Sequence, residues 1–161
     1  MTPTIRSATS DDTDVIARFN TALAIETEDV RLDPHTITQG VRAGLADDSK
    51  ALYFLAEIDG CVVGQIMITH EWSDWRNGDI WWIQSVYVEH DFRRRGVFRA
   101  LYQHVIDRAR SAGAVGVRLY VDADNITAQQ TYEVLGMRLS NYKVMETMFT
   151  NAAKIMGVRP E

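Results

Sequence analysis

The stretch that decides the fold reads Val86-Tyr87-Val88-Glu89-His90-Asp91-Phe92-Arg93-Arg94-Arg95-Gly96-Val97-Phe98-Arg99-Ala100-Leu101. An apolar strand ends here, a basic loop turns, and an amphipathic helix begins at a glycine. The first amides of a helix have no partner inside the helix and lie at the positive end of its dipole. Such an end binds phosphate or pyrophosphate, and glycine permits close approach to the backbone. The loop therefore predicts an anion site, with a solvated basic turn as the plainer alternative.

The residues before this loop predict three neighbouring strands. Ala51–Ile58 and Cys61–Thr69 are apolar runs joined by Asp59-Gly60, which is a hairpin turn signal. Asp79–Val88 is apolar at successive positions, a pattern typical of a central strand that is covered on both faces. Trp72–Gly78, which ends in an Asn-Gly turn signal, is expected to be the loop between the second and third of these strands.

The remaining elements alternate in a way that predicts an α/β fold. We expect a strand at Thr4–Ala8, a helix capped by Thr9 or Ser10 and running to about Glu26, a helix capped by Asp33, a helix from Gly96 to Ala112, a strand at Val115–Val121, a helix from Asn125 to Leu135, and one or two closing strands within Met137–Phe149. The predicted order is βααβββαβαβ(β), a mixed central β-sheet flanked by helices.

No linker or shift in composition divides the chain. A single domain over residues 1–161 is therefore expected, with its core at about 4–149 and a short tail that is either a frayed end or a dimer contact. A homodimer is the oligomer that such a contact would form.

Composition excludes several classes of protein. The chain has 161 residues, with 17 Lys and Arg against 22 Asp and Glu, and its net charge of −5 disfavours a nucleic-acid partner. No apolar run approaches the ~20 residues of a membrane span, and the N-terminus lacks the pattern of a signal peptide. Cys61 stands alone and the four histidines lack metal-ligand spacing, so neither a disulfide nor a metal is expected. A cytoplasmic protein fits these features most simply.

Two motifs, in the right order and on the right elements, resemble those of the GNAT superfamily of acyl-CoA-dependent N-acetyltransferases. The family's signature Arg/Gln-x-x-Gly-x-Gly/Ala is similar to Arg93-Arg94-Arg95-Gly96-Val97-Phe98. Its second signature, an Asn followed seven residues later by a Tyr before a Gly, is similar to Asn125, Tyr132 and Gly136. The order of elements fits as well, so the resemblance covers nearly the whole chain and implies the GNAT fold with acetyl-CoA as co-substrate.

The resemblance also implies a role for each matched position. Its implied cofactor-binding residues are Val86, Tyr87 and Val88 for the acyl arm, Arg93, Arg94, Arg95, Gly96, Val97 and Phe98 for the pyrophosphate, and Asn125 for the pantetheine arm. A backbone amide near Val86 would polarise the carbonyl, and Tyr132 would be the general acid that protonates the departing thiolate. A core aromatic is the plainer interpretation of Tyr132. Phe98 stands where the family has Gly or Ala. Because it begins an apolar helix stripe, its ring is expected to point into the core.

The acceptor side is less well defined by the sequence. Acidic, aromatic and polar positions make the candidate substrate-binding set Glu26, Glu28, Glu71, Trp75 and Gln84. Acids beside aromatic rings suit a cationic amine, although the four tryptophans are equally typical of cross-strand packing. Trp81 and Trp82 point to opposite faces of a strand, so one of them at most lines a given pocket. No general base stands out, and a water relay aligned by Gln84 and Ser85 is the default.

The predicted function is acetyl transfer from acetyl-CoA to a primary amine of a small molecule. Three alternatives stay open: acetylation of a protein N-terminus or lysine, a non-catalytic acyl-CoA-binding regulatory module, and a nucleic-acid binder using the basic loop. CoA release with an amine separates an enzyme from a binding module, and strongly salt-dependent DNA binding would favour the last alternative.

Overall fold

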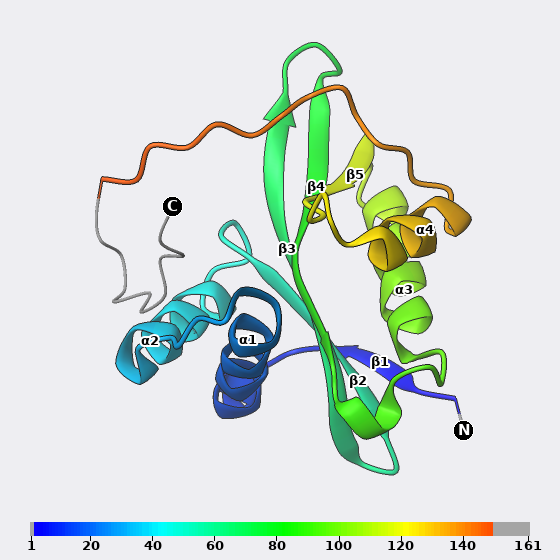
Figure 1. The fold of residues 1–161 in the computed structure, drawn as a ribbon. Coiled ribbons are helices and arrows are strands. Elements are labelled where there is room, and N and C mark those ends of the chain that lie inside the picture. The colour runs from blue at the N-terminus through cyan, green and yellow to red at the C-terminus, as the bar shows by residue number, and fades with distance from the viewer. Residues whose placement is uncertain (1, 150–161) are drawn as a thin grey trace.

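A five-stranded sheet in the order β1-β2-β3-β4-β5 organises the computed structural model, which describes residues 2–149 (Figure 1). The strands are β1 Thr4–Ser7, β2 Leu52–Ile58, β3 Cys61–Ser73, β4 Gly78–Val88 and β5 Gly116–Leu119. The helices are α1 Thr13–Glu28, α2 Pro34–Leu45, α3 Val97–Ser111 and α4 Ile126–Val134, with 3-10 turns η1 Ser10–Asp12 and η2 His90–Phe92. Strands β1 to β4 pair antiparallel and β5 runs parallel to β4, so the sheet is mixed, as predicted.

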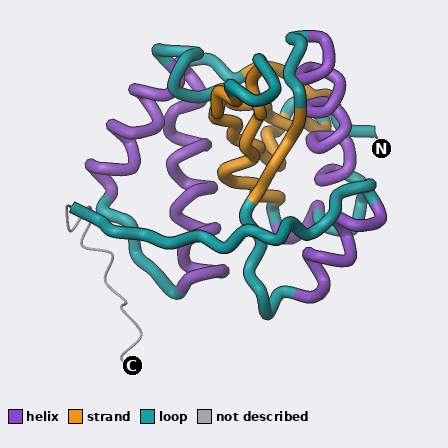
Figure 2. The backbone as a smooth tube through the Cα atoms, turned by 90° about the horizontal axis from the view of Figure 1, so that it is seen from above, coloured by secondary structure: helices purple, strands orange, loops and turns teal. Residues whose placement is uncertain are grey.

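Helices cover both faces of the sheet, and each face has its own core. Figure 2 shows the strands enclosed between two groups of helices. On one face α3 packs Leu101 and Val105 against Ile66 and Trp81, all of them buried. On the other face α1 and α2 pack over Leu55 and its buried neighbours. The continuous apolar pattern of β4 follows from this burial on two sides.

Several local sequence signals are confirmed. The Asp59-Gly60 turn has positive φ at both residues, which is the conformation that a two-residue hairpin favours. Asp33 caps α2, since its carboxylate accepts a hydrogen bond from the Thr36 amide at 2.8 Å, and Pro34 fills the first turn. Gly136 ends α4 with a φ of 92°.

Two boundaries differ from the prediction. Residues Trp72 and Ser73 belong to β3, because they pair with Asp79 and Gly78 of β4, so the loop shrinks to a turn at Asp74–Asn77. Thr9 precedes the 3-10 turn η1, and the residue that caps α1 itself is Asp12.

The predicted closing strands are wrong: no strand forms within residues 137–149. Apolar residues fall on odd positions at 137 and 139, on even positions at 142 and 144, and on both from 145 onward, so the segment lacks the constant period of two that would bury one face. Its large apolar side chains from Leu139 onward are accordingly exposed, up to 95% for Met145 and Phe149. The segment runs from α4 across the molecule towards α2 (Figure 1). The expectation for the tail after Thr150 lies outside the described residues.

A β-bulge shapes the part of the sheet that matters most for ligands. Met67 pairs with Ser85 and Ile68 with Ile83, so Gln84 is an extra residue on β4. Pairing between β4 and β5 ends at Ile83–Leu119, and β4 continues to Val88 without β5 beside it. Bulges bend a strand and increase its twist, and here the bulge coincides with the place where the two strands separate.

The N-terminal strand is tied to η1 by a bidentate ion pair. Both guanidinium nitrogens of Arg6 lie 2.8 Å from Asp12, and Arg6 Nε lies 2.7 Å from Glu57 on β2. The Arg6 hydrogen bonds hold the pKa of the Asp12 carboxyl below its usual value. A lowered carboxyl pKa stabilises the fold above the unfolded-state pKa of about 4, and this contribution is lost as the pH falls through the folded value.

We therefore expect Asp12→Asn to lower the free energy of unfolding by about 1.5–3 kcal/mol at neutral pH, the range for hydrogen bonds to charged groups. The difference between wild type and variant should shrink as the pH falls below about 4. Urea denaturation at the two pH values measures it, with Asp11→Asn, an exposed neighbour, as the control. A pH-independent difference would contradict this account.

Candidate active site

The basic loop enters α3 through two residues of positive φ. Arg94 has a φ of 60° and Gly96, the residue before the helix, a φ of 81°. A Cβ atom added at Gly96 would meet no atom within 4 Å, so the space in front of the glycine is open. The amides of Val97 and Phe98 lie in the first turn, where a helix offers no internal acceptor. This arrangement fits a phosphate group, as the sequence predicts.

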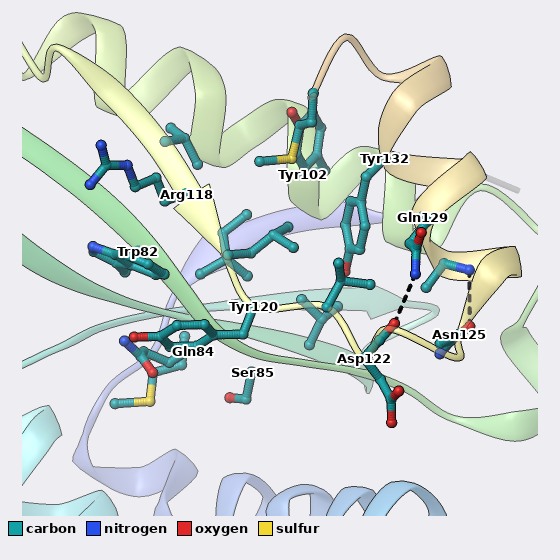
Figure 3. Close-up of a pocket in the computed structure, with 18 of the residues that line it drawn as sticks. Trp82, Gln84, Ser85, Tyr102, Arg118, Tyr120, Asp122, Asn125, Gln129 and Tyr132 are labelled. Atoms are coloured by element: carbon teal, nitrogen blue, oxygen red, sulfur yellow. Dashed lines mark hydrogen bonds between the residues drawn. The ribbon is translucent and has the colours of Figure 1, made fainter. Parts of the chain in front are cut away.

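Two depressions flank the open edge of β4. The loop pocket lies against the end of β4 and the basic loop that follows, including Val88, Arg94, Gly96 and Val97. The cleft, which Figure 3 shows in part, lies against α1, the outer half of β4, α3, β5 and α4. Five residues border both depressions: Leu23, Glu26, Val86, Ala128 and Tyr132. A molecule in the pocket and a molecule in the cleft would therefore meet beside Tyr132.

Tyr132 stands on α4 and is half-buried. Its ring meets Phe98 edge-on with centroids 5.7 Å apart, and Phe98 in turn lies 6.2 Å from Tyr102 on α3. Burial raises the pKa of the Tyr132 phenol above its usual value, with a further contribution from Tyr102. The phenol consequently stays protonated at neutral pH and can donate its proton.

Phe98 and Asn125 both make contacts within the protein. The Phe98 ring packs against the buried cluster around α3 and supports Tyr132, while the residue still borders the loop pocket. Asn125 caps α4, because its Oδ1 accepts a hydrogen bond from the Ala128 amide at 3.0 Å (Figure 3). It borders the cleft rather than the loop pocket. One acceptor of Asn125 is thus engaged within the protein.

The arginines of the loop have different surroundings. Arg93 is held by the protein: Nη2 lies 2.6 Å from the Glu26 carboxylate and Nε donates to the Val88 carbonyl at 2.9 Å. Glu26 raises the pKa of the Arg93 guanidinium by this hydrogen bond. Arg94 borders the loop pocket, whereas Arg95 lies outside it with its guanidinium 5.5 Å from the Phe92 ring. Arg94 is the loop arginine best placed to meet a ligand.

Glu26 joins α1 to β4. Besides Arg93, its carboxylate accepts a hydrogen bond from the Tyr87 hydroxyl at 3.2 Å. Burial is the main cause that raises the pKa of Tyr87, and the Glu26 charge adds to it. The Tyr87 side chain therefore packs under α1, with its ring centroid 5.1 Å from that of Phe19.

The other acceptor-side candidates separate in the structure. Glu28 and Gln84 border the cleft. Trp75 sits at the tip of the β3–β4 hairpin with 87% of its surface exposed and borders neither depression. Glu71 also lies outside the lining, and its carboxylate accepts hydrogen bonds from Trp82 and Arg118. The structure thus offers no acceptor wall at Trp75.

The cleft contains residues that the sequence does not bring together. Trp82, Arg118 and Tyr120 line one part of it, from β4, β5 and the segment that follows β5. Trp81 is buried on the opposite face, as the alternation of a strand requires. Ser85 borders the cleft, and its hydroxyl is buried and has no hydrogen-bond partner within residues 2–149. Strand alternation could have pointed to Trp82, but no local signal marks Arg118.

Among the described residues, no group of three or more His, Cys, Asp and Glu side chains is arranged to hold a metal ion. Within the same residues, every helix is too short or too polar to cross a bilayer.

Comparison with known proteins gives consistent matches. The model of the Acetyltransferase (GNAT) family matches residues 18–137. The crystal structure of a possible acetyltransferase from Clostridium difficile 630 has a TM-score of 0.87 and 44% identity, covering 94% of this chain and 100% of that one.

Curated relatives match over shorter segments. A ribosomal protein bS18-alanine N-acetyltransferase from Salmonella typhimurium is 42% identical over 52 residues, 32% of this chain and 35% of that protein. A mycothiol acetyltransferase from Corynebacterium aurimucosum is 29% identical over 124 residues, 75% of this chain and 41% of that protein. The matched part thus spans less than half the length of each relative.

The loop geometry predicts opposite effects of one substitution at two glycines. Gly96→Ala should lower the free energy of unfolding by about 1–2 kcal/mol, because an L-residue with a Cβ is strained at positive φ. Gly40→Ala, inside α2 with open space around the Cβ position, should raise it by about 0.5–1 kcal/mol. Denaturant unfolding of both variants measures the contrast, and a stabilised Gly96→Ala protein would contradict the loop conformation.

Proposed function

The chain belongs to the acetyltransferase (GNAT) family, and we propose that it transfers an acetyl group from acetyl-CoA to the primary amine of a small molecule. The observation that carries this proposal is that Val86 and Tyr132 border both depressions. A donor and an acceptor bound in separate depressions would meet at a strand edge and at a phenol. Transfer between two bound molecules requires that their reacting atoms are held close together.

The donor side uses the free edge of β4 and the start of α3. Backbone groups of Val86, Tyr87 and Val88 would hold the acyl arm, because β5 does not pair with this part of β4. The amides of Gly96, Val97 and Phe98 would hold the pyrophosphate, with Arg94 supplying charge and Arg95 adding positive potential at longer range. A contact of Asn125 with the pantetheine arm receives no support from its position, since Asn125 borders the cleft and not the loop pocket. Arg93 would act through its backbone, since its side chain is bound to Glu26.

The chemistry needs few protein groups. Acetyl-CoA supplies an activated carbonyl, and the acceptor nitrogen forms a bond to that carbon as the carbon–sulfur bond breaks. The Val86 amide would stabilise the charge on the carbonyl oxygen. Tyr132 gives its proton to the departing thiolate, and the proton lost by the amine leaves through water near Gln84 and the unpartnered Ser85 hydroxyl.

Glu26 and Glu28 would attract the protonated form of the amine to the cleft. Glu26 borders the loop pocket as well, so the nitrogen it attracts lies close to the donor side. Because the Glu26 carboxylate is shared with Arg93 and Tyr87, it is held in place rather than free to rotate. The sequence-based proposal that Glu71 and Trp75 bind the acceptor directly receives no support from their positions.

A protein N-terminus is the second candidate acceptor, because the Salmonella relative acts on an alanine of a ribosomal protein. A panel of small amines and of short peptides with free N-termini, assayed for CoA release, tests the proposed function. We expect turnover with a small amine and slower turnover with peptides. Acetyl-CoA binding without release for any amine would instead favour a regulatory module.

Tyr132→Phe should lower kcat by about 10²–10⁴-fold, the usual contribution of acid catalysis, while acetyl-CoA binding is retained. Because the pKa of Tyr132 is raised, its phenol should lose its proton only above about pH 10, and the wild-type rate should fall there. That high-pH loss should be absent from the variant. Tyr53→Phe, at a buried tyrosine beneath α2, is the matched control for the loss of a hydroxyl. Full activity of Tyr132→Phe would remove Tyr132 from the mechanism.

A further inference from the structure

We propose that the acceptor carries an anionic group, a carboxylate or a phosphate, which Arg118 binds at the far end of the cleft from Tyr132. This inference rests on the proposed acetyl transfer and names the class of acceptor. In Figure 3, Arg118 and Trp82 lie together at one end of the pocket and Tyr132 at the other.

The Arg118 guanidinium has N–H groups that the described residues leave free to bind a ligand. Arg118 sits on β5 opposite Trp82, and 38% of its side-chain surface is exposed. Among the described residues, Nη1 alone donates hydrogen bonds, at 3.3 and 3.4 Å to the two Glu71 oxygens. Its other N–H groups have no acceptor within residues 2–149. A guanidinium presents its donors as a planar fork that matches carboxylate and phosphate oxygens.

Glu71 fixes this end of the cleft without facing it. Its carboxylate accepts hydrogen bonds from the Trp82 indole and from Arg118. One residue of β3 thus positions both the aromatic ring and the cation. Arg118 and Trp82 line the cleft, whereas Glu71 does not. A ligand in the cleft at this end consequently meets Arg118 and Trp82, whereas Glu71, with 42% of its side-chain surface exposed, lies beside them outside the lining.

An aromatic platform lies beside the guanidinium. The rings of Trp82 and Tyr120 lie 4.6 Å apart with planes at 34°, and the Arg118 guanidinium carbon lies 6.0 Å from the Trp82 centroid. Tyr120 leaves 59% of its surface exposed. An apolar chain or ring that links the amine to the anion would lie against these two rings.

Three of the charged residues that line the cleft come from different elements. The acids Glu26 and Glu28 stand on α1, Glu26 bordering both depressions as Tyr132 does, and Arg118 stands on β5 in register with Trp82. Val86 lies four positions along β4 from Trp82, a distance of roughly 10–13 Å. The acceptor is therefore an amine at one end of a chain and an anion at the other, separated by about this distance.

A chain-length series tests the proposal. We would measure kcat/KM for 4-aminobutanoate, 8-aminooctanoate and 12-aminododecanoate, with octylamine as the uncharged match and 8-aminooctyl phosphate as the phosphate form. We expect the eight-carbon anions to exceed octylamine by at least about tenfold, the effect of a hydrogen bond to a charged group. Whichever anion is faster identifies the group that Arg118 binds.

Substitution of Arg118 supplies the matched control. Arg118→Gln should bring the ratio of 8-aminooctanoate to octylamine close to one, while octylamine turnover and acetyl-CoA affinity stay unchanged. Arg118→Lys, which keeps the charge without the fork, should give an intermediate ratio and shows that the site still folds. Octylamine turned over as fast as 8-aminooctanoate by the wild type would overturn the anion site and leave acetyl transfer standing. Failure of every amine would overturn both.

Discussion

The separation of β5 from β4 beyond Ile83 is the constraint on which the rest of the structure depends. A buried strand must find partners for its N–H and C=O groups, and β4 runs five residues past its last pairing with β5. The bulge at Gln84 turns the strand at this point. An edge of this kind suits an extended amide-containing arm, and the start of α3 lies where that edge ends.

A rigid frame surrounds the open edge. α1 is held against Tyr87 of β4 by the contact of its ring with Phe19, and against the loop after β4 by the ion pairs of Arg18 with Glu89 at 2.6 Å and of Glu26 with Arg93. The α1 wall of the cleft is therefore fastened both to the end of β4 and to the basic loop. Fixed positions for both reactants reduce the entropy cost of bringing them together.

Local chemistry made much of this fold predictable. The Asp59-Gly60 turn, the Asp33 cap and the glycine before α3 each impose a backbone conformation through a single residue. The hairpin at Trp72–Gly78 was mispredicted because pairing with β4 carries β3 further than its own apolar run. Met137–Phe149 was mispredicted because an apolar composition does not provide the constant alternation of a strand.

The site was predictable only where one segment contains it. The loop from Arg93 to Phe98 is contiguous, and its glycine and helix start are visible in the sequence. Glu26 meets Arg93 across 67 positions and Arg118 meets Glu71 across 47, and neither pairing has a local signal. Trp75 was a candidate because of the aromatic and acidic residues near it in the sequence, but it lies exposed at the tip of the β3–β4 hairpin.

Binding of acetyl-CoA by the free edge of β4 and the start of α3 is tested most directly by hydrogen exchange of individual amides, followed by NMR with and without acetyl-CoA. We expect slower exchange at Val86, Val88, Val97 and Phe98, and unchanged exchange at Leu55 in the interior of the sheet. Protection confined to other segments, or none at saturating acetyl-CoA, would contradict it.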